Sequence, residues 1–252
     1  MGRERQQLNA EIVDLCLLAG KIMLQNGAET YRVEDTMTRM AAALGFPGAH
    51  SYVTPTVIMF TINRTEPVRL YRIEERTTDL EKVTRVNDIS RKLSQRQISS
   101  EEALQALNAV DDDGHIYPLW LQVLAGAATG GCFTVMFNGG LDDAAAALLV
   151  SGAGFAAATW LHRLVQVKFF AEFSAALLIG LLAYALVYWG AGSEIDKIII
   201  GSVMPLVPGL LITNAVRDLM AGHLISGLSK GAEAFLTAFA IGTGIGLVLS
   251  FL

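Results

Sequence analysis

The sequence predicts an α-helical integral membrane protein in which about five transmembrane helices follow a small α+β cytoplasmic domain. Hydrophobic residues make up 52% of its 252 residues, and its mean hydropathy of +0.44 is too high for an ordinary soluble protein. The charges are segregated, because residues 1–117 hold 14 of the 19 Lys and Arg and 17 of the 24 Asp and Glu. The two parts must face different solvents. We therefore expect a soluble domain over residues 1–115 and a transmembrane domain over residues 116–252.

Residue patterns in the first 115 residues predict a mixture of helices and strands. Apolar residues recur at helical spacing in two segments, the first followed by Gly27 and the second opened by Thr30 as candidate N-cap. These helices cover residues 8–25 and 30–44, and two strand-like runs over 51–62 and 68–73 suggest a hairpin. Two pairs have capping-box spacing and predict further helix starts: Thr78 with Glu81, and Ser99 with Glu102.

Five apolar segments of the remaining chain predict membrane spans. Each is close to the roughly 20 residues that a helix needs to cross the hydrocarbon core. The charged residues 111–113 precede the first segment, and Tyr117 and Trp120 lie where an interfacial aromatic belt begins. The predicted spans are 118–138, 143–161, 170–190, 197–216 and 233–252.

The basic residues of the short connections predict the orientation in the membrane. The connection after the first span has none, and that after the third has Lys197. The connections after the second and fourth spans have four: Arg163, Lys168, Arg217 and Lys230. Because basic loops stay on the cytoplasmic side, this distribution predicts a cytoplasmic amino-terminal domain and an external carboxyl terminus.

Composition and motifs argue against several classes of protein. A net charge of -5 without a basic stripe disfavours nucleic acid as a partner. Cys16 and Cys132 lie far apart in apolar runs, which suggests neither a disulfide framework nor a metal site. The sequence contains no Walker A, GxGxxG, HExxH or GxSxG motif. We therefore expect no cofactor, no metal and no enzymatic activity.

The fourth predicted span contains the first candidate site. Pro205, Pro208 and Gly209 fall in its middle, where each proline removes a backbone hydrogen bond. Interrupted helices often line the substrate sites of transporters, although a tolerated kink is the alternative interpretation. Asn214 and Asp218 follow on the same helix and, four residues apart, share one face.

Two further polar groups are candidates. Asn138, a candidate substrate contact, precedes two glycines and the acids Asp142 and Asp143 between the first two spans. Asp143 has the position of an N-cap carboxylate, which leaves Asp142 as the better group for handling a proton or a ligand. In the soluble domain, Glu29 and Glu34 lie beside a turn, where stabilisation of a helix start is the simpler explanation.

Together these motifs resemble the threonine/serine exporter (ThrE) family, specifically its YjjP-type amino-terminal half. The resemblance extends over essentially the whole chain. Its motifs are residues 27–30 with Glu34, residues 138–140 with Asp142, and residues 206–209 followed by Asn214, Asp218, Gly222 and His223. It implies an exporter of the bacterial inner membrane, with threonine and serine or, for YjjP/YjjB-like pairs, succinate as substrate. It also implies a second, YjjB-like membrane subunit, with a homo-oligomer as the alternative.

The residues and the resemblance together favour secondary export of a small carboxylate. A helix start beyond Pro208 would bind the carboxylate through its N–H groups and dipole, and Asn214 would hydrogen-bond the substrate. Asp142 or Asp218 would carry a proton. A regulatory or scaffold subunit without transport activity is the alternative function. A membrane enzyme comes third, with Glu29 and Glu34 as its only candidate acids.

Overall fold

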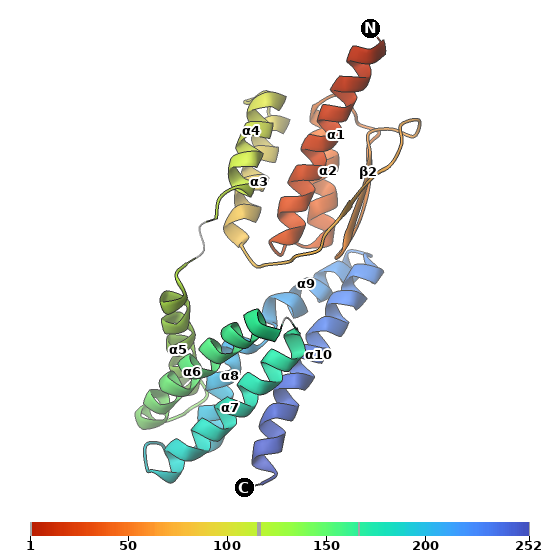
Figure 1. Ribbon diagram of the computed structural model, residues 1–252. Helices are drawn as coiled ribbons and strands as arrows, with labels where there is room; N and C mark the ends of the chain where they lie inside the picture. Colours follow the sequence, from red (N-terminus) through yellow and green to blue (C-terminus); the bar gives the residue numbers. More distant parts are fainter. Residues whose placement is uncertain (1, 115–116, 166, 252) are drawn as a thin grey trace. The chain divides into compact units, whose positions relative to one another are not determined.

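A computed structural model describes residues 2–114, 117–165 and 167–251 (Figure 1). The chain forms two compact units. The first contains Met1–His115 and Leu210–Gly231, and the second contains Ile116–Gly209 and Ala232–Leu252. The predicted domain boundary at residues 115 and 116 lies outside the described residues. The helical fold class with a small sheet is confirmed.

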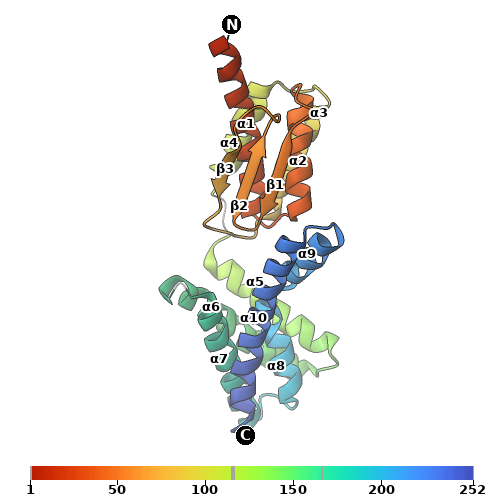
Figure 2. The same ribbon diagram turned by 90° about the vertical axis from the view of Figure 1, so that its right-hand side faces the viewer.

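Four helices and a small sheet form the amino-terminal part of the first unit. The helices are α1 (Gly2–Gln25), α2 (Thr30–Ala43), α3 (Leu80–Ser94) and α4 (Ser100–Asp111). The strands β1 (His50–Thr54), β2 (Val57–Thr61) and β3 (Arg69–Arg72) form an antiparallel sheet in the order β1-β2-β3. Figure 2 shows this sheet lying against α1 and α2. Ile22, Met37 and Phe60 are fully buried in the core between them.

The run 51–62, predicted as one strand, is two strands. Thr54 pairs with Val57, so Pro55 and Thr56 alone form the connecting turn. Proline has no N–H to donate to a neighbouring strand, which explains why the run breaks there.

Two helix starts also differ from the predicted ones. Asp79, rather than Thr78, caps α3 and accepts hydrogen bonds from the backbone N–H groups of Glu81 and Lys82. Glu29 occupies the N-cap of α2, so Thr30 is its first helical residue. The capping box of Ser99 and Glu102 is confirmed.

The second unit is helical and apolar. It contains α5 (Leu119–Met136), α6 (Leu141–Val165), α7 (Lys168–Tyr188), α8 (Ile195–Val203) and the 3₁₀ turn η1 (Met204–Leu206). Helix α9 (Gly209–Met220) follows, and α10 (Leu224–Leu249) begins in the first unit and ends in the second. In the described part of the chain, α5, α6, α7 and α10 are long and apolar enough to cross a membrane. Counting α8, η1 and α9 as one broken span gives a fifth.

Small residues bring α5 and α6 of the second unit close together. A Cβ atom added at Gly130 would lie 2.3 Å from the Cβ of Ser151, and one added at Gly126 would lie 3.0 Å from the Phe155 ring. The Ser151 hydroxyl donates a hydrogen bond to the Gly126 carbonyl at 2.9 Å. Gly126 and Gly130 have the small-xxx-small spacing that allows helices to approach closely, and here it serves packing within this unit.

Candidate functional site

A glycine turn after α1 presents the first functional residues. Gly27 has a φ of +92°, and the Ala28 N–H donates a 3.0 Å hydrogen bond to the Met23 carbonyl. This pattern is the Schellman motif that closes a helix at a left-handed glycine. The chain reverses here, so Glu29 and Thr30 stand at the start of α2.

A second glycine turn of the same kind joins α9 to α10. Gly222 has a φ of +86°, and the His223 N–H donates to the Asp218 carbonyl at 2.8 Å. The two helices form a hairpin in the first unit, which brings Lys230 of α10 beside Asp218 of α9.

Asp218 is the centre of a buried polar cluster in the first unit. Its carboxylate accepts hydrogen bonds from the Thr30 N–H at 2.9 Å, the Thr30 hydroxyl at 2.9 Å and the Lys230 ammonium at 2.7 Å. Asp218 and Thr30 are 0% exposed, and Lys230 is 5% exposed. Buried charges persist when they are paired and hydrogen-bonded in this way. The hydroxyl of Thr30 thus serves Asp218 rather than the start of its own helix.

Two glutamates of α2 and its N-cap surround this cluster. Glu29 forms ion pairs with Arg217 and, at 3.1 Å, with Arg32. Burial alone would raise the pKa of Glu29, but hydrogen bonds and these two guanidinium groups outweigh it and hold the pKa below its usual value. Glu34 accepts a 2.8 Å hydrogen bond from the Val53 N–H and lies 3.7 Å from His223 Nδ1. Burial raises the pKa of Glu34, and the negative charge of Asp218 acts in the same direction.

The Asn214 side chain also contacts the glycine turn. Its amide nitrogen donates a 2.8 Å hydrogen bond to the Gly27 carbonyl, and its side chain is buried. Five of the predicted residues therefore come together in the first unit: Glu29, Thr30, Glu34, Asn214 and Asp218.

The predicted helix interruption is present. Helix α8 ends at Val203, η1 covers Met204–Leu206, and Val207 is extended with a ψ of 129° before α9 begins at Gly209. A Cβ atom added at Gly209 would meet no atom within 4 Å. Pro205 and Pro208 thus lie at an interruption between two helices rather than at a kink within one.

The acids between α5 and α6 have different environments. Asn138 has a φ of +63°, and its carbonyl accepts a hydrogen bond from Lys197. Asp142 is exposed, whereas Asp143 is 2% exposed. Asp143 accepts hydrogen bonds from the backbone N–H groups of residues 140, 193 and 194 at 3.2, 2.7 and 3.0 Å. Asp143 therefore connects two loops of the second unit through hydrogen bonds, whereas the Asp142 side chain is exposed.

Reasoning from sequence missed the cationic partners of the buried cluster. Arg217 and Lys230 were treated as charges of a membrane loop, but they lie in α9 and α10 within the first unit. The available signal was a lysine within a largely apolar helix, because such a charge needs a buried partner. The predicted orientation therefore rests on fewer basic residues. Arg163 and Lys168 follow the second predicted span, and Lys197 follows the third.

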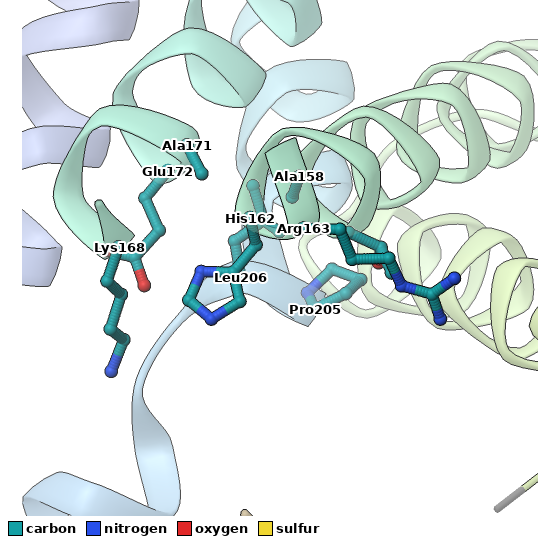
Figure 3. A pocket seen from close by; sticks show the side chains of 9 residues that line it. Ala158, His162, Arg163, Lys168, Ala171, Glu172, Pro205 and Leu206 are labelled. Atoms are coloured by element: carbon teal, nitrogen blue, oxygen red, sulfur yellow. The ribbon is translucent and has the colours of Figure 1, made fainter. Parts of the chain in front are cut away.

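The second unit also contains a pocket of about 310 Å³ beside the interruption (Figure 3). It is formed by the end of α6, the start of α7, and Pro205 and Leu206 of η1. Of the predicted site residues, Pro205 lines it.

Four long apolar helices, or five when the broken span is counted, define the described part of the chain as a multi-pass helical membrane protein. A family model described as "Putative threonine/serine exporter" (ThrE) matches residues 14–252. The chain belongs to this threonine/serine exporter family.

Named relatives agree with this membership. The Klebsiella aerogenes protein called "Probable succinate transporter subunit YjjP" is 30% identical over 246 residues, which cover 95% of this chain and 92% of that protein. An Escherichia coli protein of the same name is 26% identical, with 95% and 94% covered. A Mycobacterium tuberculosis "Probable threonine/serine exporter" is 25% identical over 95% of this chain but only 46% of its own length. No solved structure matches the chain.

Proposed function

We propose that this chain is a subunit of a secondary transporter that exports a small carboxylate-bearing metabolite across the bacterial inner membrane. The substrate class comprises threonine, serine and C4-dicarboxylates such as succinate. Family membership supports the transporter class, and the names of the relatives mention both kinds of substrate.

The observation that carries this proposal is the interruption at residues 204–209. An apolar membrane segment loses its regular backbone hydrogen bonding there, which is tolerated where the backbone is covered by protein or lines a cavity. Pro205, Pro208 and Gly209 would form the substrate path. The start of α9 at Gly209 would favour a carboxylate, since helix N-termini attract anions.

Asp218 is the proposed proton carrier. Its carboxylate is buried and paired with Lys230, so protonation would remove the charge that holds the α9–α10 hairpin to Thr30. Asp142 remains the second candidate, because it is exposed and can exchange protons with water directly. For Asn214 we propose a structural role, since its amide N–H group already donates to Gly27. Asn138 stays a candidate substrate contact.

The proposed arrangement in the cell follows from loop charges and from the relatives. Arg163 in the last turn of α6 and Lys168 at the start of α7 favour a cytoplasmic location for this end of the two helices and for the amino-terminal domain. The chain covers 46% of the Mycobacterium tuberculosis exporter, and two relatives are named as subunits. A second, YjjB-like membrane subunit is the partner we propose, with a homo-oligomer as the alternative.

Reconstitution tests the proposal. Proteoliposomes would be loaded with labelled threonine, serine or succinate, with the chain alone, the partner alone and both together. We expect saturable efflux of at least one substrate when both are present. Absence of efflux for all three would favour the scaffold function instead.

A further inference from the structure

A small polar pocket lies in the first unit, between α2 and α3. Its volume is about 120 Å³, whereas pockets for whole metabolites typically have roughly 300–1,000 Å³, so it has room for a single small group. Its lining residues are all polar or charged, and on each helix they recur at the spacing of one helix face. We call it the arginine pocket, and it is lined by Arg32, Asp35, Thr36, Arg39, Asn87, Ser90 and Arg91.

The arginine pocket has an excess of positive charge. Its lining contains three arginines and one acid, which leaves two positive charges without a counter-charge in the lining. Arg39 forms an ion pair with Asp35, and Arg32 forms one with Glu29, which already has a second guanidinium from α9 as partner. Within the described residues, Arg91 forms no ion pair. At least one guanidinium group of the lining is therefore available to an anion.

Two buried hydroxyl groups face the same need for a partner. Thr36 of α2 and Ser90 of α3 line the pocket and are only 4% and 3% exposed. In the part of the chain that the structure describes, neither side-chain hydroxyl makes a hydrogen bond, whereas the neighbouring Thr38 and Ser94 hydroxyls both donate to backbone carbonyls. Buried polar groups are nearly always hydrogen-bonded, so these two hydroxyls indicate an acceptor within the pocket.

We propose that the arginine pocket binds a doubly charged phosphate group, either inorganic phosphate or the phosphate of a phosphomonoester. Guanidinium groups match phosphate oxygens in geometry and charge, and the hydroxyls of Thr36 and Ser90 would donate to the same oxygens. A carboxylate has two oxygens and one charge, so it would leave donors of the lining unused. The bound group would connect α2 to α3. None of the lining residues belongs to the proposed substrate path, so the inference does not depend on what is exported.

Equilibrium dialysis of labelled inorganic phosphate tests the inference. The full chain is used in phosphatidylcholine nanodiscs at about pH 7.5, where phosphate groups are mostly doubly charged, and empty nanodiscs give the background. We expect saturable binding that is displaced by sulfate and by glycerol 3-phosphate, with displacement by succinate at least about tenfold weaker. Absence of saturable phosphate binding would overturn the inference. Displacement by succinate that equals displacement by sulfate would also overturn it.

Variants on α3 test whether the phosphate lies in this pocket. Arg91→Gln should weaken phosphate binding at least about tenfold, a difference of about 1.4 kcal/mol, and Ser90→Ala should weaken it as well. Lys92→Gln removes the same charge from the next residue, which is exposed and does not line the pocket, so phosphate affinity should stay within about twofold of the wild type. Equal affinities in Arg91→Gln and Lys92→Gln would contradict a site at this pocket. Because Arg91 is exposed and has no ion pair within the described residues, this variant should fold normally.

A lipid headgroup could supply the same phosphate chemistry. Phosphate binding is therefore compared in nanodiscs that contain phosphatidic acid, a phosphomonoester, and in nanodiscs with an equal fraction of phosphatidylglycerol, an anionic phosphodiester. Weaker phosphate binding with phosphatidic acid would identify the lipid headgroup as an occupant of the pocket. Equal binding in the two would identify a soluble phosphate as the ligand. Either result supports a phosphate site, provided that Arg91→Gln weakens the binding.

Discussion

Breaking the ion pair of Asp218 and Lys230 should destabilise the first unit locally. Asp218→Asn leaves the Lys230 ammonium buried without its counter-charge, because Lys230 is 5% exposed and Asp218 is fully buried. Removing one partner of a buried pair costs about 3–5 kcal/mol. The double variant Asp218→Asn with Lys230→Met removes both charges, and it should recover much of this loss because an uncharged pair needs no counter-charge.

Hydrogen exchange at the Thr30 amide measures this effect, since that N–H donates directly to Asp218. A local loss of about 3–5 kcal/mol corresponds to exchange that is roughly 10²- to 10³-fold faster or more. Exchange at the Phe60 amide in the sheet of the same unit, which pairs away from this cluster, serves as the internal control. Wild-type exchange at Thr30 in Asp218→Asn would refute the argument that this pair stabilises the α9–α10 hairpin.

Three further predictions concern the path, the charges and the orientation. Pro208→Ala should let the helix close and Gly209→Leu should fill the open space, so each should lower transport at least about tenfold. The folded protein holds the pKa of Glu29 below its ordinary value of 4.5. The stabilisation that Glu29 gives the first unit is therefore complete above pH 4.5, and it is lost as the pH falls through the lower pKa of the folded state. Glu29→Gln should therefore lower the free energy of unfolding at neutral pH, and this free energy should fall less steeply in acid than that of the wild type. Denaturant unfolding measures both effects. With the native cysteines replaced, Gly140→Cys should react with an impermeant thiol reagent from outside, and Val167→Cys only from inside.

Each of these predictions has its own check. Transport of the two variants at the interruption is normalised to the amount of inserted protein, and wild-type rates in both would move the substrate path elsewhere. An unchanged dependence of stability on pH in Glu29→Gln would show that its ion pairs contribute nothing. The reverse labelling pattern at residues 140 and 167 would place the amino-terminal domain outside.

Local signals in the sequence predicted the elements well. Hydropathy over about 20 residues identifies helices such as α5 and α7, because the membrane core imposes length and apolar composition. The capping box of Ser99 and Glu102 fixed the start of α4 because it depends only on residues three positions apart. The division of the strand at Pro55 was equally local, and the proline was the signal for it.

Contacts between distant residues were not predictable in this way. Thr30 and Asp218 are 188 positions apart, so the assignment of Asp218 to a membrane helix gave no indication that it packs against the turn after α1. The partnership with Lys230 depends on the reversal at Gly222, which turns a separation of 12 residues into a 2.7 Å contact. The pocket at Glu172 likewise arises only when α6, α7 and η1 are assembled.

The most direct test of the exporter assignment is efflux from proteoliposomes that contain the partner subunit with either the wild-type chain or Gly209→Leu. Labelled serine, threonine and succinate are loaded separately, and vesicles with the partner alone give the background. We predict saturable efflux with the wild-type chain and a loss of at least about tenfold with Gly209→Leu. Efflux with the wild-type chain that equals the background for all three substrates would contradict the account.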